Sequence, residues 1–369
     1  MRLIPTQICT SGMKLAKNIY NDSGVVLLRM GSELSDAIIN KLQTYGIEYI
    51  YIQDPFTDDI VVPELIRSET RVRVLGEMKV HFRKISDGLH RKRYSDVSIE
   101  KNLRKIIHSL LDDLRDNDQA LIMMDSMRVS DEYLYSHSLN VAIYAVLLGV
   151  SVGYTEDKLI EFGIGSLMHD IGKTQIDEKL LQKPGKLTET EFAEVKKHTT
   201  LGYEVLKEMS SISLPAAHCA YQHHERMNGS GYPRGLTGDE IHEYAKWLGI
   251  IDSFDAMVSH RVYRKALLPH HALEVLYAGS GTLYDESKIQ IFRNKVVVYP
   301  IGMSVMLSTK ETGVVADVNV DYPHRPVVRV MTKESGESWK EPYEIDLSKK
   351  LNVTITDILF SEHCKLHIL

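Results

Sequence analysis

Residues 159–173 read LIEFGIGSLMHDIGK, a largely apolar run that ends in the adjacent pair His169 and Asp170. A histidine beside an aspartate offers a neutral nitrogen ligand and an anionic oxygen ligand, the combination that suits divalent metals of intermediate softness. An isolated pair of this kind more often forms a surface salt bridge. Here, further candidate ligands stand in or beside predicted helices on both sides of the pair, namely His137, His198, His223, His224 and Asp252. The sequence therefore predicts a metal site inside a helical bundle.

The composition is ordinary for a globular protein and argues against a general nucleic-acid-binding role. The 369 residues suffice for two or three domains with a sizeable core, and 43% of them are hydrophobic and 25% charged. The formal net charge is -6, whereas a binder of nucleic-acid polymers needs basic patches that meet the phosphates. This charge balance still permits a small anionic ligand in a local pocket.

The cysteines and the apolar runs indicate the cellular compartment of the protein. The three cysteines, Cys9, Cys219 and Cys364, lie far apart and form no CxxC motif. This pattern is typical of a reducing compartment and argues against a disulfide framework or a thiolate zinc site. The longest apolar run, residues 141–150, is too short to span a bilayer, and the N-terminus lacks the features of a signal peptide. We therefore expect a cytoplasmic protein without a membrane span.

Residues 1–60 predict a small α+β unit. Residues 24–30 and 47–52 have strand patterns, and residues 35–45 form a predicted helix that ends at Gly46. No residues in this unit have catalytic spacing. We expect it to have a structural or regulatory role.

Residues 64–118 predict a helical connector with a heptad-like apolar stripe. The spacing of three and four residues recurs twice, in Leu75, Met78, Phe82, Ile85 and Leu89 and again in Ile99, Leu103, Ile106 and Leu110. Two interpretations are open. The stripe either packs on the protein's own helices or forms a homodimer. We favour the first interpretation, because two heptads are few for a dimeric coiled coil.

The rest of the chain divides into a helical part and a strand part. Residues 119–285 have helical patterns almost throughout, and capping boxes at Thr188 with Glu191 and at Thr237 with Glu240 mark two helix starts. From about residue 296 the apolar period changes to two, with predicted strands at 304–307, 313–320, 326–331, 344–347 and 353–359. We therefore predict a mainly α protein with a small β-barrel-like unit over residues 296–369.

The candidate ligands stand in five motifs that occur in a fixed order. They are HSLNVA from His137, LMHDIGK with His169 and Asp170, KKHTTLGYEVL with His198, HHERMNGSGYPRGL from His223, and IIDSFDAMVSHRVYRKA with Asp252. Over roughly residues 120–280 this set resembles the HD-GYP family of the HD superfamily of metal-dependent phosphohydrolases. The resemblance implies a helical HD-type bundle and a bacterial signalling enzyme. It also implies hydrolysis of cyclic di-GMP to linear pGpG, and sometimes on to GMP.

The resemblance also implies roles for individual residues. Lys173 stands where the family has a lysine beside the scissile phosphate, so Asp170 and Lys173 are the expected catalytic residues. Tyr232, Arg261 and Arg264 match positions that contact the cyclic dinucleotide. The family's metal ligands correspond to His137, His169, Asp170, His198, His223, His224 and Asp252.

The chemistry of these residue types agrees with the implied roles. The two oxygens of a carboxylate can bridge two cations, which makes Asp170 the natural bridge, and two metals about 3.5–4 Å apart can promote in-line displacement at phosphorus. Imidazoles with carboxylates and no thiolates favour iron or manganese, and zinc, nickel and cobalt are also compatible. Lys173 can neutralise charge on the phosphoryl oxygens, and the guanidiniums of Arg261 and Arg264 suit a phosphate or a guanine edge.

Several nearby residues are better explained without a role in the site. We expect His218 to be packed or hydrogen-bonded, and Asp255 to be a structural hydrogen-bond acceptor. His260, His270 and His271 are expected to face solvent.

The sequence departs from the family pattern in three places. Tyr133 stands where some members have a glutamate that binds a third metal, and a tyrosine does not replace a carboxylate at neutral pH. We therefore predict a two-metal site, which puts the second hydrolytic step in doubt. Thr199 replaces a proline, and residues 260–262 read His-Arg-Val instead of Asp-Arg-Pro, a change that can shift Arg261 and alter the substrate preference.

The expected function is hydrolysis of cyclic di-GMP by a dinuclear metal centre. Two alternatives are open. The first alternative is an effector that binds a cyclic dinucleotide with little turnover. The second is a phosphodiesterase for another cyclic dinucleotide such as cyclic GMP-AMP (cGAMP).

Overall fold

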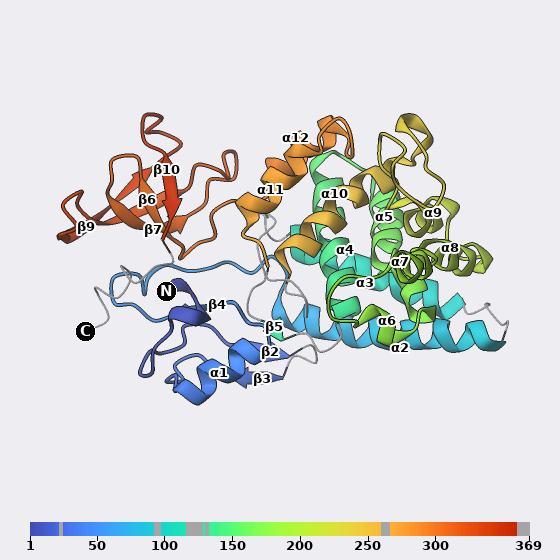
Figure 1. Cartoon of the computed structure of the whole chain (residues 1–369), viewed down its shortest axis with the longest axis horizontal. Helices are drawn as coiled ribbons and strands as arrows, with labels where there is room; N and C mark the ends of the chain where they lie inside the picture. The colour runs from blue at the N-terminus through green and yellow to red at the C-terminus, as the bar shows by residue number, and fades with distance from the viewer. Residues whose placement is uncertain (22–24, 92–96, 116–127, 130–132, 260–265, 360–369) are drawn as a thin grey trace.

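The computed structural model describes residues 1–21, 25–91, 97–115, 128–129, 133–259 and 266–359. Its helices gather into one bundle on the right of Figure 1, and the two terminal units lie together on the left. The N-terminal unit is blue and the C-terminal sheet is orange to red in this view. Segments from the two ends of the chain are therefore neighbours in space.

The N-terminal unit combines short strands with one helix. It contains β1 (Arg2–Pro5), the 3-10 helix η1 (Thr6–Ile8), β2 (Ile19–Asn21), β3 (Val26–Leu28), α1 (Asp36–Thr44) and β4 (Tyr49–Ile52). Strand β1 pairs with β4, and β2 pairs with β3 and with β5 (Arg128–Val129). The hydroxyl of Ser35 caps α1 by accepting a hydrogen bond from the Ile38 N–H group. The predicted helix and its two flanking strands are confirmed, whereas the sequence did not predict β1 and β2.

The C-terminal unit is a five-stranded antiparallel sheet. Its strands are β6 (Ser304–Leu307), β7 (Thr312–Asp317), β8 (Val327–Thr332), β9 (Ser338–Asp346) and β10 (Ile355–Ile358). They lie in the order β10-β6-β7-β8-β9. The five strands expected from the period of two are confirmed, but β9 begins six residues before its predicted start at residue 344.

The two terminal units share one hydrophobic core. Leu3 and Ile50 of the N-terminal unit belong to the same buried cluster as Val305 and Val328 of the C-terminal sheet. The backbone N–H group of Leu3 donates a 2.8 Å hydrogen bond to the Gly302 carbonyl. The N-terminal unit is thus packed directly on the C-terminal sheet, a contact that the sequence pattern did not predict.

The helical bundle holds the predicted ligand motifs. Its elements are α2 (Ser68–Arg91), α3 (Val97–Arg115), α4 (Tyr133–Ser151), α5 (Glu156–Met168), η2 (Ile171–Gln175), α6 (Glu178–Leu181), α7 (Glu189–Lys196), α8 (His198–Glu208), α9 (Leu214–Gln222), η3 (Gly238–Glu240), α10 (Glu243–Val258), α11 (Pro269–Ala278) and α12 (Glu286–Arg293). Helix α4 contacts α5, α10, α2 and α3 and therefore occupies the centre of the bundle. Among the described residues, one helical segment, Leu134–Ser151, is long and apolar enough to cross a membrane. This segment is longer than the apolar run at residues 141–150. However, 72% of it is buried inside the fold. That burial is typical of a core helix.

The apolar stripe of α2 and α3 faces the interior of the bundle. Met78, Phe82, Leu103 and Leu110 are fully buried in the same cluster as the residues of α4 and α5. The interpretation that these helices pack on the protein's own domain is therefore confirmed. A homodimer stays a prediction, and this buried stripe does not provide a free surface for it.

Candidate metal centre

Seven candidate ligands from five parts of the bundle point toward one buried point. His137 lies on α4 and Asp252 on α10, and His198 is the first residue of α8. His169 and Asp170 occupy the junction between α5 and η2, and His223 and His224 follow the end of α9.

The carboxylate of Asp170 lies between two sets of imidazoles. Its Oδ2 atom is 3.7 Å from His137 Nε2 and 3.4 Å from His169 Nε2. Its Oδ1 atom is 3.5 Å from His198 Nε2 and 3.7 Å from His223 Nε2. Each oxygen of one carboxylate thus faces its own pair of imidazole nitrogens, which is the arrangement that a bridging ligand requires.

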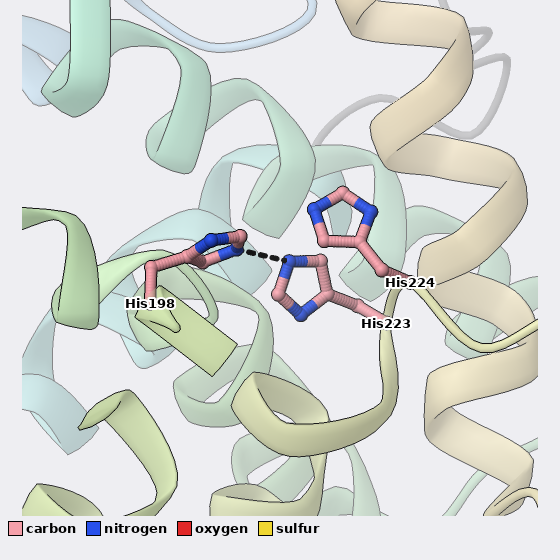
Figure 2. Close-up of side chains that lie close together, drawn as sticks. All are labelled: His198, His223 and His224. Atoms are coloured by element: carbon pink, nitrogen blue, oxygen red, sulfur yellow. Dashed lines mark hydrogen bonds between the residues drawn. The ribbon is translucent and has the colours of Figure 1, made fainter. Parts of the chain in front are cut away.

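The two sets form separate clusters of potential donor atoms. His137, His169 and Asp170 make one, and His198, His223 and His224 make the other, with all donor atoms of a cluster within 4.8 Å of one another. Figure 2 shows the second cluster, in which the three rings converge and His198 Nε2 lies 3.3 Å from His223 Nε2. The structure therefore offers two adjacent cation sites with Asp170 between them.

Asp252 also spans the two clusters. Its Oδ1 atom is 3.0 Å from His137 Nε2 and 3.9 Å from His169 Nε2, while its Oδ2 atom is 3.9 Å from His224 Nδ1. Asp252 therefore brings a second carboxylate to the same space.

Hydrogen bonds fix the orientation of four candidate histidines. In each of them Nδ1 lies 2.7–3.0 Å from an oxygen that only accepts, so Nδ1 carries a proton and Nε2 is the nitrogen left to face the site. The acceptors are Asp255 Oδ2 for His137, the Ser166 carbonyl for His169, the Val195 carbonyl for His198, and the Cys219 and Ala220 carbonyls for His223. The ring nitrogens that face the site are thus the ones able to bind a cation.

The protonation states also suit metal binding. Burial lowers the pKa of His198 to about 3, with a further contribution from Lys173, and burial likewise lowers the pKa of His223 and His224. Burial opposes ionisation of Asp170, but the charge of Lys173 and the contacts with His169 and His223 together outweigh it and hold the pKa of that carboxyl well below its usual range. These imidazoles are therefore neutral and this carboxylate is ionised at pH 7.

His137 differs from the other histidines because it meets two carboxylates. Burial disfavours the charged ring, but the hydrogen bonds that the ring donates to Asp252 and Asp255, together with the charges of these carboxylates, outweigh this effect and raise the pKa of His137 to about 9. A cation at Nε2 must therefore displace a proton from this ring.

Two buried polar atoms in the site have no hydrogen-bond partner among the residues that the structure describes. They are His169 Nε2 and Asp170 Oδ1, and both side chains are completely buried. An unpaired buried polar atom is costly, and a cation in each cluster would satisfy one of them, His169 Nε2 on the Oδ2 side of Asp170 and Asp170 Oδ1 on the His198 side. The neutral nitrogen and anionic oxygen donors therefore fit a pair of divalent metals.

Comparison with known proteins identifies the bundle. Residues 115–287 match the family model described as "HD domain", and residues 304–367 match "KOW domain associated with HD domain". The chain carries an HD domain. An HDG"Y"P protein of Bdellovibrio bacteriovorus has the same fold, with a TM-score of 0.51 at 17% identity over 79% of this chain and 98% of that chain.

Curated relatives of this HD domain are named as phosphodiesterases. A cyclic di-GMP phosphodiesterase of Pseudomonas aeruginosa is 33% identical over 54% of this chain and 48% of its own length. A cyclic di-GMP phosphodiesterase response regulator of Xanthomonas campestris is 39% identical over 38% of each chain. A 3'3'-cGAMP-specific phosphodiesterase of Vibrio cholerae is 35% identical over 42% of this chain and 33% of its own length. The chain thus spans about half or less of these relatives.

The open side of the HD domain's site is formed by Tyr232, Lys173 and His224. Lys173 is half-buried and donates a hydrogen bond to Asp170. The ring of Tyr232 stacks on that of His224 at 4.7 Å, and the ammonium group of Lys196 lies 5.7 Å from the centre of the Tyr232 ring. A ligand that approaches the clusters therefore meets an aromatic ring and two lysines.

The loop that carries Tyr232 is held by a residue that sequence reasoning missed. Glu225 is buried, and its carboxylate accepts hydrogen bonds from the backbone N–H groups of Arg234 (2.8 Å) and Leu236 (2.9 Å). The third residue of the HHE triplet thus shapes the loop and is not among the candidate ligands. The sequence signal for this role was a glutamate directly after two candidate ligands.

The structure also places most of the residues near the site that were not predicted to be metal ligands. Asp255 accepts hydrogen bonds from His137 and Asn140, so the prediction of a structural acceptor is confirmed. His218 packs against Tyr203, and His271 is exposed, as expected. The expectation that His270 faces solvent is wrong, because it is half-buried and its Nδ1 atom is buried, with no hydrogen-bond partner in the described part of the chain. Arg261, Arg264 and His260 lie outside the described residues.

Proposed function

We propose that this HD domain is a metal-dependent phosphodiesterase that hydrolyses cyclic di-GMP to pGpG. The observation that carries the proposal is the position of Asp170, whose two oxygens each face a separate pair of imidazole nitrogens. The names of the curated relatives supply the substrate class. The proposed ligands are those seven residues: His137, His169, Asp170, His198, His223, His224 and Asp252.

The residues of the site prepare it for attack on a phosphodiester. Two divalent cations held there supply Lewis acidity and a nucleophile at neutral pH. Asp170 and Asp252 provide the negative charge that holds the cations, while His198 and His223 remain neutral donors. Lys173 is placed to donate to a phosphoryl oxygen and to neutralise the charge that grows on it in the transition state. In the hydrolysis the oxygen of water would bond to phosphorus while the P–O bond to the 3′ oxygen of one nucleotide breaks, and the 3′ oxygen would leave as a hydroxyl after taking up a proton, which opens the ring.

The donor set also supports a choice of metal. Five imidazoles, two carboxylates and no thiolate favour iron or manganese over ions that prefer sulfur, and zinc, nickel and cobalt are compatible with the same atoms. We propose two ions. Tyr133 stands at the position of a third-metal glutamate, so we also propose that the reaction ends at pGpG.

The open side of the site supports a dinucleotide substrate. Tyr232 presents an aromatic edge, and Lys173 and Lys196 offer positive charge to the phosphates of a dianionic ring. We propose Arg261 and Arg264 as further substrate contacts on the basis of the family resemblance.

Cyclic GMP-AMP is the second candidate substrate. The 35% identity to the cGAMP-specific enzyme of Vibrio cholerae favours it, and the His-Arg-Val sequence at residues 260–262 departs from the family pattern at a position that can alter the substrate preference. The homodimer and the cytoplasmic location stay predictions.

The test is a turnover assay on protein purified without oxygen and loaded with iron or manganese. The expected result is loss of cyclic di-GMP and growth of pGpG, and Asp170→Asn protein is the inactive control. Competition between cyclic di-GMP and cyclic GMP-AMP in one mixture identifies the preferred substrate. If fully metal-loaded protein binds the ligand tightly and the ligand is recovered intact, the protein is an effector and the proposal of a phosphodiesterase is wrong.

A further inference from the structure

A buried line of polar contacts runs from helix α2 to the candidate metal ligand His137. It begins at Arg71, which is only 7% exposed although it carries a charge. Arg71 Nη1 donates a 2.7 Å hydrogen bond to Asn140 Oδ1 on α4. A buried guanidinium is costly unless its donors are satisfied, so this contact ties the two helices together.

The line continues from Asn140 into the metal centre. Asn140 Nδ2 donates to Asp255 Oδ1 at 3.1 Å, and His137 Nδ1 donates to Asp255 Oδ2 at 2.7 Å. Asp255 is completely buried and His137 is 1% exposed. Solvent therefore cannot replace any of these contacts.

The side-chain amide of Asn140 has two chemically different ends, so its orientation matters for the contact with Asp255. Asn140 offers a carbonyl oxygen on one side and an NH₂ group on the other. While Arg71 holds the oxygen, the NH₂ group faces Asp255. A turned amide would place its oxygen against the Asp255 carboxylate, and two acceptors repel each other. Arg71 thus fixes the amide in the orientation that supports Asp255, and Asp255 in turn orients the ring of His137.

We propose that Arg71 is a positioning residue for the metal centre, acting through Asn140 and Asp255 on His137. This inference rests on the proposed metal site. It makes α2, which begins at Ser68 just after the N-terminal unit, part of the structure that determines metal affinity. The neighbouring Arg67 anchors the same end of α2 to α3, because its backbone N–H group and its guanidinium both donate to Asp113. A shift of this helix end therefore changes the support of His137.

The experiment measures Co²⁺ binding to the full-length, metal-free protein by the visible absorption of the bound ion. The variants are Arg71→Met and Arg71→Lys, with Arg73→Met as the matched control. Arg73 lies on the same helix, is exposed and pairs only with Glu77 among the described residues. Circular dichroism of the metal-free proteins establishes that each variant is folded.

We expect Arg71→Met to weaken the ion bound at His137 by about 10- to 100-fold, as for other residues that orient a metal ligand. Arg71→Lys, which keeps the charge and a hydrogen-bond donor, should recover part of this loss, and Arg73→Met should bind like the wild type. Asn140→Leu combined with Arg71→Met should weaken binding no further than the stronger single change, because both break one line.

Wild-type affinity in both Arg71 variants, or additive losses in the double variant, would overturn the inference while leaving the metal site intact. Failure of the wild type to bind Co²⁺ would overturn the proposed function as well, so the two failures are distinguishable.

Discussion

A Cβ atom added at Gly172 would lie 1.9 Å from the carbonyl oxygen of His198. The backbone of η2 and the start of α8 are therefore in direct contact, with no room for a side chain between them. This contact places Asp170, two residues before Gly172, beside the ring of His198. A glycine is therefore required at this position of the HDIGK sequence, because a side chain would push apart the two segments that carry Asp170 and His198.

Gly172→Ala should separate η2 from α8 and disrupt the metal centre. Because the clash is with backbone atoms, including Gly202 N at 2.6 Å, we expect a loss of about 3 kcal/mol in the free energy of unfolding and a loss of bound metal. Urea unfolding and elemental analysis measure the two effects. Gly76→Ala is the control, since a Cβ there meets nothing within 4 Å and should stabilise α2 by about 0.5–1 kcal/mol. Equal behaviour of the two variants would contradict the steric explanation.

Asp170→Ala and His198→Ala should affect the metals differently. Asp170 faces both clusters, so its removal should abolish both ions, whereas His198 belongs to one cluster and its removal should mainly weaken one ion. Elemental analysis of metal per chain is the measurement. Equal losses in the two variants would show that Asp170 does not bridge.

Lys196→Met should weaken substrate binding without changing metal content. The ammonium group of Lys196 lies 5.0 Å from the Phe192 ring and 5.7 Å from the Tyr232 ring, and no salt bridge to it is found among the described residues. Loss of a charged contact to a phosphate should raise KM for cyclic di-GMP roughly tenfold, or about 1.4 kcal/mol. Lys197→Met is the control, because Lys197 is exposed and pairs with Glu194. An unchanged KM in Lys196→Met would remove this lysine from the substrate site.

His270 should make the protein less stable in mild acid. Burial and the neighbouring His271 lower the pKa of His270 to about 4, below the value of about 6.5 expected in the unfolded chain. The unfolded chain therefore binds the proton more readily, and stability is lost as the pH falls from about 6.5 toward 4. Since the ring is half-buried, we expect the loss to be about 1 kcal/mol after solvent screening.

Urea midpoints at pH 7 and pH 5 measure this loss. His270→Gln should lose less stability than the wild type between these two pH values. An identical loss in both proteins would show that His270 does not titrate as described.

Local patterns in the sequence predicted local structure well. Thr188 and Glu191 form the reciprocal capping box that their spacing indicated, and so do Thr237 and Glu240. The alternation of apolar residues after residue 296 predicted five strands because it reports which face of each strand is buried. The motif order also predicted which side chains meet around Asp170.

Contacts between distant segments could not be predicted in this way. Apolar periodicity shows that a face is buried but does not show what covers it. The pairing of Leu3 with Met303, which joins the two ends of the chain, left no trace in either local pattern. Arg71 and Asn140 likewise look like ordinary polar helix residues, since their importance depends on a contact between α2 and α4.

The most direct test of the central claim is anomalous diffraction from crystals of the manganese-loaded protein. We expect two peaks about 3.5–4 Å apart, one near His137 and His169 and the other near His198 and His223, with Asp170 between them. A single peak, or peaks away from Asp170 in fully loaded protein, would contradict this claim.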